Sequence, residues 1–140
     1  MIPVNYFAVL IAAIASMVLG FVWYGPLFGS MWIKMSKFSK KDMEKAKSKG
    51  MQAQYALTLV GSLLMSFVLY HSLVFASSYM KVSGVSVGLS TGFWNWLGFI
   101  VPVTLTSVLW EGKSWSLWIL NNAYNLLSLL MMGVILSLMV

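Results

Sequence analysis

Four long stretches of the sequence carry no charged residue, and they limit what the chain can fold into. The first runs from about Asn5 to Tyr24, and three more follow at about 53–77, 87–110 and 115–139. About twenty apolar residues are what one helix needs to cross a hydrocarbon core about 30 Å thick. In lipid every backbone polar group must be bonded within the structure, which a helix achieves by itself. The sequence therefore predicts an all-α integral membrane four-helix bundle, a single domain over residues 1–140.

Charge is confined to the segments between these stretches. All nine cationic residues are lysines, and seven of them fall within residues 34–49, inside a first loop expected at 25–52. Lys113 lies in the third loop, and Lys81 is alone in the second. Cytoplasmic loops carry the excess of lysine, so the first and third loops are predicted to be cytoplasmic, with both termini outside (N-out/C-out), in the cell inner membrane. Five tryptophans gather at the same boundary, as an interfacial aromatic belt would: Trp23, Trp32, Trp110, Trp115 and Trp118.

The lysine-rich loop is predicted to contain one short helix. Ser39 followed by Asp42 is typical of a capping box, and Gly50 is a suitable stop. Two positions for this helix stay open: its few apolar residues rest on the membrane surface while the lysines bind anionic lipid, or the helix is solvated. No nucleic-acid surface is expected, because the cations are not spread over a folded face.

Small and polar residues recur at every fourth position on the first two spans. Such stripes favour close helix contact in lipid, although in an alanine-rich helix the spacing can also arise by chance. Because four helices leave outward faces uncovered, a homo-oligomer is predicted. The stripe residues are Ala8, Ala12, Ser16 and Gly20 on the first span, and Thr58, Ser62, Ser66 and Tyr70 on the second.

The segment WYGPLFGSMW, residues 23–32, marks the end of the first span. Pro26 disfavours helical geometry at the preceding glycine, so the helix is expected to end near Tyr24. The segment shares the predicted cytoplasmic boundary with Glu111, the only acid outside the lysine-rich loop. Boundary acids are candidates for function, but Glu111 at the start of a helix is also suited to a capping role. The candidate boundary site consists of Trp23, Tyr24, Gly25, Pro26, Gly29, Trp110, Glu111 and Lys113.

A second candidate is a polar face inside the bilayer. Asn95 and Asn125 lie about 22 Å and 18 Å from the cytoplasmic turn at about 1.5 Å per residue, so they could meet near the bilayer centre. Interhelical hydrogen bonding is the ordinary use of such amides, and a path for a polar solute is the alternative. In the third span Pro102 is expected to kink the helix. The face consists of Asn95, Asn121, Asn125 and Ser128.

His71, the only histidine, is a possible titrating group near the opposite interface. No second histidine or acid is expected at its depth, which favours a hydrogen-bonded interfacial histidine over a proton relay.

The remaining residues offer no catalytic constellation. The chain has no Cys and no Arg, no paired carboxylates within the spans, and no phosphate-binding loop. No catalytic residue, cofactor or metal ligand is therefore expected. The leading hypothesis is a non-enzymatic interaction or assembly protein, and the alternative is a small-solute or ion transporter or channel subunit with a path along Asn95, Asn121, Asn125 and Glu111.

Several segments together resemble a known family. They are MIPVNYFAVL, WYGPLFGSMW, SKKDM, WLGFIVP and LWEGKSWSLWILNNAYNLLSLLMMGVIL, and they cover essentially the whole chain. The chain is similar to the four-span bacterial family called domain of unknown function 1761. The resemblance implies the four-span fold and implies no activity.

Overall fold

Four long helical segments run through the chain, as the apolar stretches predict. This computed structural model describes residues 3–140, so Met1 and Ile2 of the expected domain 1–140 lie outside the described part. The segments Tyr6–Leu27, Gln52–Met80, Val85–Leu109 and Trp115–Met139 are each long and apolar enough to cross a membrane. The elements are α1 (Tyr6–Val22), the π-helix η1 (Trp23–Leu27), α2 (Gly29–Ser36), α3 (Lys40–Ser48), α4 (Gln52–Met80), α5 (Val85–Asn95), the π-helix η2 (Trp96–Ile100), α6 (Val101–Thr104), α7 (Thr106–Leu109) and α8 (Trp115–Met139).

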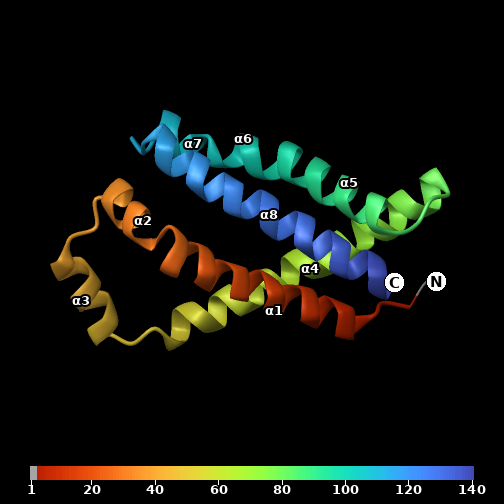
Figure 1. Cartoon of the computed structure of the whole chain (residues 1–140), viewed down its shortest axis with the longest axis horizontal. Helices are drawn as coiled ribbons and strands as arrows, with labels where there is room; N and C mark the ends of the chain where they lie inside the picture. The colour runs from red at the N-terminus through yellow and green to blue at the C-terminus, as the bar shows by residue number, and fades with distance from the viewer. Residues whose placement is uncertain (1–2) are drawn as a thin grey trace.

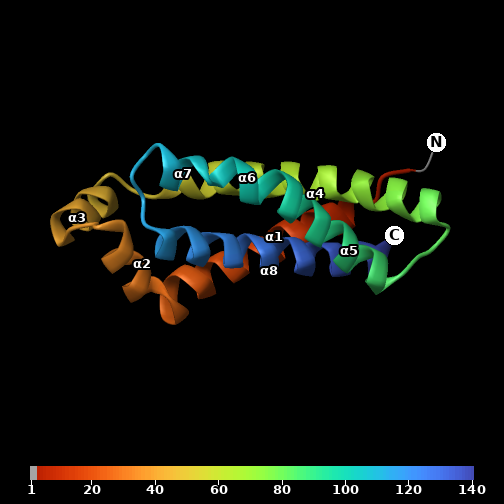
Figure 2. The ribbon, with the colours of Figure 1, turned by 90° about the horizontal axis from the view of Figure 1, so that it is seen from above.

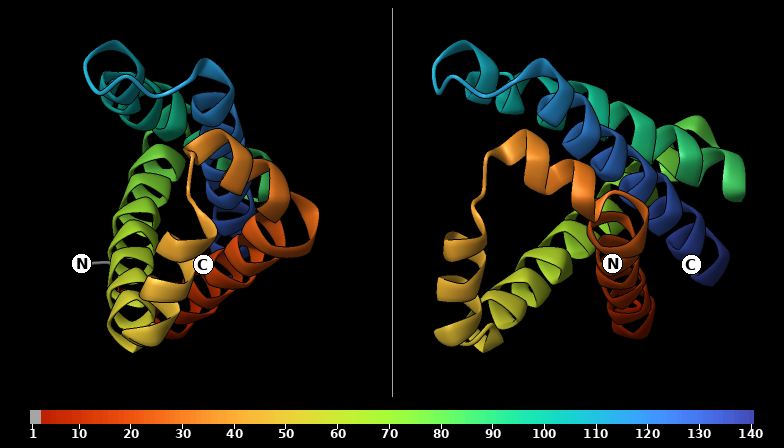
Figure 3. Two further views of the ribbon diagram at one scale, coloured as in Figure 1. Left: turned by 90° about the vertical axis from the view of Figure 1, so that its left-hand side faces the viewer. Right: turned by 60° about the vertical axis from the view of Figure 1, so that its left-hand side comes forward.

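The connections alternate between the two ends of the bundle. Figure 1 shows α2, α3 and the turn between α7 and α8 at one end, with the turn between α4 and α5 and the C-terminus at the other. Figure 3 shows α2 and α3 leading from the end of α1 across to the start of α4. The seven lysines of residues 34–49 and Lys113 therefore share one end, called the lysine-rich end below. Its cytoplasmic orientation stays a prediction.

The small-residue stripe of α1 packs inside the chain, between α4 and α8. Ala8 and Ala12 are fully buried, and the Ser16 hydroxyl lies 2.6 Å from that of Ser128 on α8. On α4 the Ser66 hydroxyl donates to the Val9 carbonyl at 2.9 Å. Interhelical contact through both stripes is thus confirmed for most of their members. The exception is Thr58, which is exposed and donates to the Gln54 carbonyl of its own helix.

Helices α5 and α8 approach each other closely through their glycines. Gly88 lies against the Gly133 carbonyl, and a Cβ added to Gly92 would meet the Leu129 carbonyl oxygen at 2.6 Å. The α5 and α8 backbones touch at these positions because glycine has no side chain to separate them. Such contact is the usual basis of tight helix pairs in lipid. Sequence reasoning passed over this pair, although Gly88 and Gly92 stand at the small-xxx-small spacing.

The first span does not end near Tyr24, and that expectation is wrong. The helix continues through the π-helix η1 with Pro26 inside it, and the Phe28 N–H donates to the Trp23 carbonyl at 2.9 Å, five residues back. A π-turn changes the hydrogen-bond register and so accommodates a residue without an N–H. The chain then turns at Phe28 and continues as α2, which Figure 2 shows directed away from the axis of α1.

The third span bends as Pro102 predicts, over a longer segment than expected. Regular α-helix stops at Asn95, continues as η2, and resumes as the short helices α6 and α7 on either side of Leu105. Figure 2 shows the change of direction between α5 and α6. The indole N–H of Trp96 donates to the Asn122 carbonyl of α8 at 2.9 Å, which ties the bent segment to the last span.

The helix predicted in the lysine-rich loop is confirmed as α3, with its capping box. The Ser39 hydroxyl accepts from the Asp42 N–H at 3.1 Å, and the Ser39 N–H donates to the Asp42 carboxylate at 3.2 Å. The Ser39 hydroxyl also donates to the Asp42 carboxylate at 2.8 Å, and this bond together with that from the Ser39 N–H holds the pKa of Asp42 below its usual value of 3.8. Gly50, just after the helix, has a φ of 80°, as a glycine stop requires.

Candidate functional site

An open cleft at the lysine-rich end brings together residues from three spans and α2. It encloses about 500 Å³. Small-molecule sites typically measure about 300–1,000 Å³. We call it the aromatic cleft, and its lining residues are Tyr24, Trp32, Thr104, Asn121, Tyr124 and Asn125.

Tyr24 joins the first span to the last. Its hydroxyl donates to Asn121 Oδ1 at 2.7 Å. Its ring meets the rings of Tyr124 and Trp32 edge-on, with centroids 5.3 and 6.3 Å apart. The π-helix η1 and the turn after it set this position: a Cβ added at Gly29 would lie only 2.8 Å from the Tyr24 carbonyl oxygen. Glycine at residue 29 therefore allows the close turn that places Tyr24 and Trp32 on one cleft.

The Tyr124 side chain of α8 packs against α1 at the bottom of the cleft. Its hydroxyl donates to the Ser16 carbonyl at 3.0 Å, and a Cβ added at Gly20 would lie 3.0 Å from that hydroxyl oxygen. Gly20, the last member of the α1 stripe, leaves the space that this tyrosine fills. The stripe thus serves helix contact along most of its length and cleft formation at its end.

A hydrogen-bonded group fixes spans three and four behind the cleft. The Trp118 indole N–H donates to Thr104 Oγ1 at 3.0 Å, and Thr104 Oγ1 lies 3.2 Å from Asn122 Oδ1. Sequence reasoning missed Thr104 and Trp96 as cleft supports. Asn122 directly follows Asn121 of the polar face in the sequence, but nothing in the sequence indicates that its carbonyl groups face span three.

The amides of the cleft retain unused hydrogen-bonding capacity. Asn125 forms no side-chain hydrogen bond with any residue of the described chain, and the Asn121 NH2 likewise has no partner within residues 3–140. The lining side chains are phenols, an indole, a hydroxyl and two amides, so none carries a charge. The cleft can therefore offer several N–H donors next to three aromatic faces.

The structure divides the predicted boundary site. Trp23 is buried against Phe28 and Tyr124, with ring centroids at 4.6 and 6.4 Å, and its indole N–H has no partner in the part of the chain that is described. Gly25 and Pro26 are exposed in η1. Tyr24, in contrast, contacts the predicted polar face of α8 through its hydrogen bond to Asn121.

The hairpin between spans three and four is exposed at the same end, at Trp110, Glu111 and Lys113. The contacts of Trp23 and Tyr24 described above do not include these three residues. The Glu111 capping interpretation is wrong, because the Ser114 hydroxyl caps α8 by accepting from the Leu117 N–H at 3.1 Å.

The residues of the predicted polar face, and His71, also lie in separate parts of the structure. Asn95 and Asn125 do not meet: the Asn95 amide donates to the Thr91 carbonyl of its own helix at 2.8 Å and lines a different cleft. Ser128 bonds with Ser16 in the core. His71 is hydrogen-bonded through Nδ1 to the Phe67 carbonyl at 2.8 Å.

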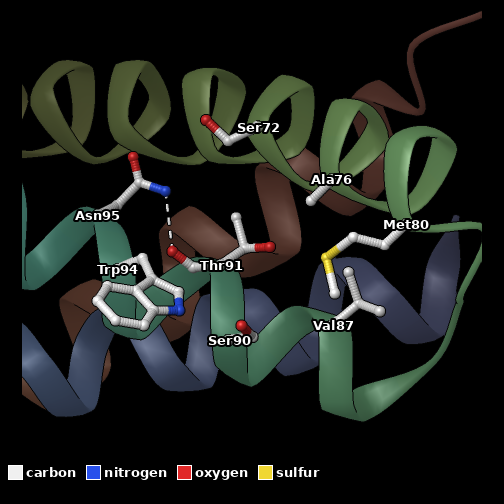
Figure 4. Close-up of a pocket in the computed structure, with 8 residues that line it drawn as sticks. All are labelled: Ser72, Ala76, Met80, Val87, Ser90, Thr91, Trp94 and Asn95. Atoms are coloured by element: carbon white, nitrogen blue, oxygen red, sulfur yellow. Dashed lines mark hydrogen bonds between the residues drawn. The ribbon is translucent and has the colours of Figure 1, made fainter.

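The second cleft lies between α4 and α5, toward the opposite end. It encloses about 280 Å³ and shares no lining residue with the aromatic cleft. Figure 4 shows its polar groups, which come from both helices. We call it the hydroxyl cleft, lined by Ser72, Ala76, Met80, Val87, Ser90, Thr91, Trp94 and Asn95.

Comparison with known proteins identifies the family of the chain without giving its activity. No curated protein and no solved structure matches the chain. A family model described as "Protein of unknown function (DUF1761)" matches residues 7–137. This match covers nearly the whole chain, including both clefts, and the chain therefore belongs to the DUF1761 family.

Proposed function

We propose that this protein is a non-enzymatic membrane interaction protein that binds an amphipathic molecule in the aromatic cleft. The observation that carries the proposal is the hydrogen bond between Tyr24 and Asn121, which joins the motif WYGPLFG to the amide-bearing face of α8 around one open volume. Aromatic rings with a few convergent polar groups are the usual composition of a ligand site.

The chemistry of the lining favours a ligand with both an apolar part and hydrogen-bond acceptors. The rings of Tyr24, Trp32 and Tyr124 provide apolar faces. The Asn125 amide and the Asn121 NH2 provide N–H donors that have no partner among the described residues. A lipid with carbonyl or phosphate oxygens above acyl chains combines both features. The lysines at this end would attract its anionic members to the cleft mouth.

The non-enzymatic part of the proposal is supported by the kinds of side chain that the cleft contains. General acid–base catalysis needs a group that exchanges a proton near the working pH. The lining consists of amides, phenols, an indole and a hydroxyl, while Glu111 and His71 belong to other parts of the molecule.

Lipid retention tests the proposal. The protein is reconstituted in vesicles of phosphatidylethanolamine and phosphatidylglycerol, released in mild detergent, and its bound lipid is counted by native mass spectrometry. We expect about one retained lipid per chain, and its loss in a Tyr24→Phe, Asn125→Leu double variant. The control is Ser90→Ala, which changes the other cleft. Equal retention by all three proteins would refute a lipid site in the aromatic cleft.

A second candidate function, a transporter or channel subunit, is favoured by the presence of polar clefts toward opposite ends of the bundle. Asn121 and Asn125 line one cleft and Asn95 the other. Because the clefts share no residue, transport would require a second conformation that connects them. In proteoliposomes, Asn95→Leu and Asn125→Leu would then each abolish solute flux, whereas a binding protein would lose function only with Asn125→Leu.

Two partners belong to the same proposal. Anionic lipid would bind the lysines of residues 34–49 at the cytoplasmic face of the inner membrane. A second copy of the chain would have to use faces other than the α1 stripe, because Ala8, Ala12 and Ser16 are already buried within one chain. Crosslinking in native membranes that yields only monomer at every protein concentration would remove the homo-oligomer from the proposal.

A further inference from the structure

Three hydroxyl groups of the hydroxyl cleft have hydrogen-bonding capacity that the described chain does not use. Thr91 is 7 % exposed, and its Oγ1 is buried without a partner in residues 3–140. Ser72 and Ser90 line the same cleft, and their hydroxyls form no hydrogen bond within that part of the chain either. Buried polar groups without partners cost free energy, and they usually indicate a water or ligand in contact with them.

Other hydroxyls farther along the same span bond to carbonyls of their own helix. Thr104 donates to the Ile100 carbonyl at 2.7 Å, and Ser107 to the Thr104 carbonyl at 2.8 Å. A serine or threonine within a helix commonly uses the carbonyl three or four residues before it. Among the hydroxyl oxygens of residues 3–140, that of Thr91 is the one that is fully buried without a hydrogen-bond partner, and this points to a partner within the cleft.

Polar side chains line the cleft from both α4 and α5. Figure 4 shows the Thr91 hydroxyl directed toward the space between Met80 and Val87, and Asn95 Oδ1 directed toward α4. The Asn95 NH2 group donates to the Thr91 carbonyl, which leaves Oδ1 as a free acceptor. Ser72 faces this side from α4. The wall toward the α4–α5 turn is apolar.

We propose that the hydroxyl cleft binds a small uncharged polyhydroxylated group. Hydroxyls both donate and accept, as those of a polyol do. The lining contains no ionisable side chain, so an ion would lose its hydration without gaining a countercharge. The volume of about 280 Å³ is at the lower limit for ligand sites. Both free glycerol and the sugar headgroup of a neutral glycolipid have this chemistry.

Two binding measurements test the proposal on the intact protein in phosphatidylcholine nanodiscs. One arm measures radiolabelled glycerol by equilibrium dialysis, and the other measures monoglucosyl diacylglycerol retained after exchange from donor vesicles. We expect saturable binding in one arm, which identifies the source of the group. Thr91→Val, which keeps the side-chain shape, should weaken this binding up to about tenfold, the usual effect of one hydrogen bond.

The control is Thr106→Val, which makes the same chemical change at an exposed hydroxyl on α7 that donates to the Val103 carbonyl. It should bind as the unchanged protein does. Ser90→Ala replaces Thr91→Val if that variant does not fold. In the glycerol arm, Asn125→Leu in the aromatic cleft should leave binding unchanged, because glycerol has no acyl chain, so failure of the two proposals can be distinguished. The proposal is overturned if neither group binds saturably, or if Thr91→Val and Ser90→Ala both bind like the control.

Discussion

Replacing Gly92 by alanine tests whether the α5–α8 contact holds the bundle together. The added Cβ would lie 2.6 Å from the Leu129 carbonyl oxygen, where ordinary contact begins at 3.4 Å, so the helices would have to separate by about 0.8 Å. The opposing atom is backbone and cannot rotate away. A gap of this size loses about a quarter to a half of the dispersion attraction across the contact. Overpacking of this kind typically costs about 1–3 kcal/mol.

Gly61→Ala is the matched control, because it makes the same change on α4 with nothing within 4 Å of the new Cβ. Alanine is the better helix former, so this variant should be stabilised by about 0.5–1 kcal/mol. The free energy of unfolding of both variants is measured in bicelles by steric trapping. Opposite signs are expected. If Gly92→Ala is as stable as the unchanged protein, or if both variants lose stability equally, α5 and α8 do not pack through these backbones.

Three further predictions concern the lysine-rich end. Gly20→Leu should displace the Tyr124 ring and lower the free energy of unfolding of the monomer by about 1–3 kcal/mol; a change in crosslinked oligomer with unchanged monomer stability would contradict this. In double-mutant cycles on the free energy of unfolding, Tyr24→Phe and Asn121→Ala should be coupled by about 0.5–1.5 kcal/mol, whereas Tyr24→Phe and Glu111→Gln should be additive within about 0.5 kcal/mol. The reverse pattern would show that the hairpin at Glu111 belongs to the site and Asn121 does not. Because the capping box holds the pKa of Asp42 below 3.8, its stabilisation of α3 is present above that pH and is lost as the pH falls through the lower folded value. The protection factors of the α3 amides, measured relative to the intrinsic exchange rate at each pH, should therefore fall in acid, and Asp42→Asn should remove this pH dependence; an unchanged pH profile in that variant would show that the carboxylate is not responsible.

The sequence predicts the spans well because their signal is one of composition and length, which a bilayer imposes on each helix separately. The capping box of α3 is equally local, since Ser39 and Asp42 are three residues apart. The end of the first span was mispredicted for a physical reason. A proline in the position of Pro26 normally ends a helix, but here a π-turn retains it, and a close turn at Gly29 follows.

The candidate site shows where reasoning from one sequence stops. Counting residues gives the depth of Asn95 and Asn125 along their helices, but it does not give the rotation of each helix about its axis. The two amides therefore share a depth range and face different clefts. The sequence indicates Tyr24 as part of the boundary site and Asn121 as part of the polar face, and only the packing of α1 on α8 brings them together. The Gly88–Gly92 spacing was readable, but it gained a meaning only with Gly133 opposite it.

The bond between Ser16 and Ser128 has a consequence for how the protein is made. It joins residues 112 positions apart, and α1 packs on α8, which is synthesised after the other three spans. Until then Ser16 has no such partner, and the side of α1 meant for α8 faces lipid or the insertion machinery. Spans three and four, in contrast, are adjacent in the chain and can pair through Gly88 and Gly133 as soon as both are inserted. We therefore expect the bundle to close when the hairpin of spans three and four packs onto the first helix, and a nascent chain arrested before residue 115 should expose the α1 stripe to crosslinking.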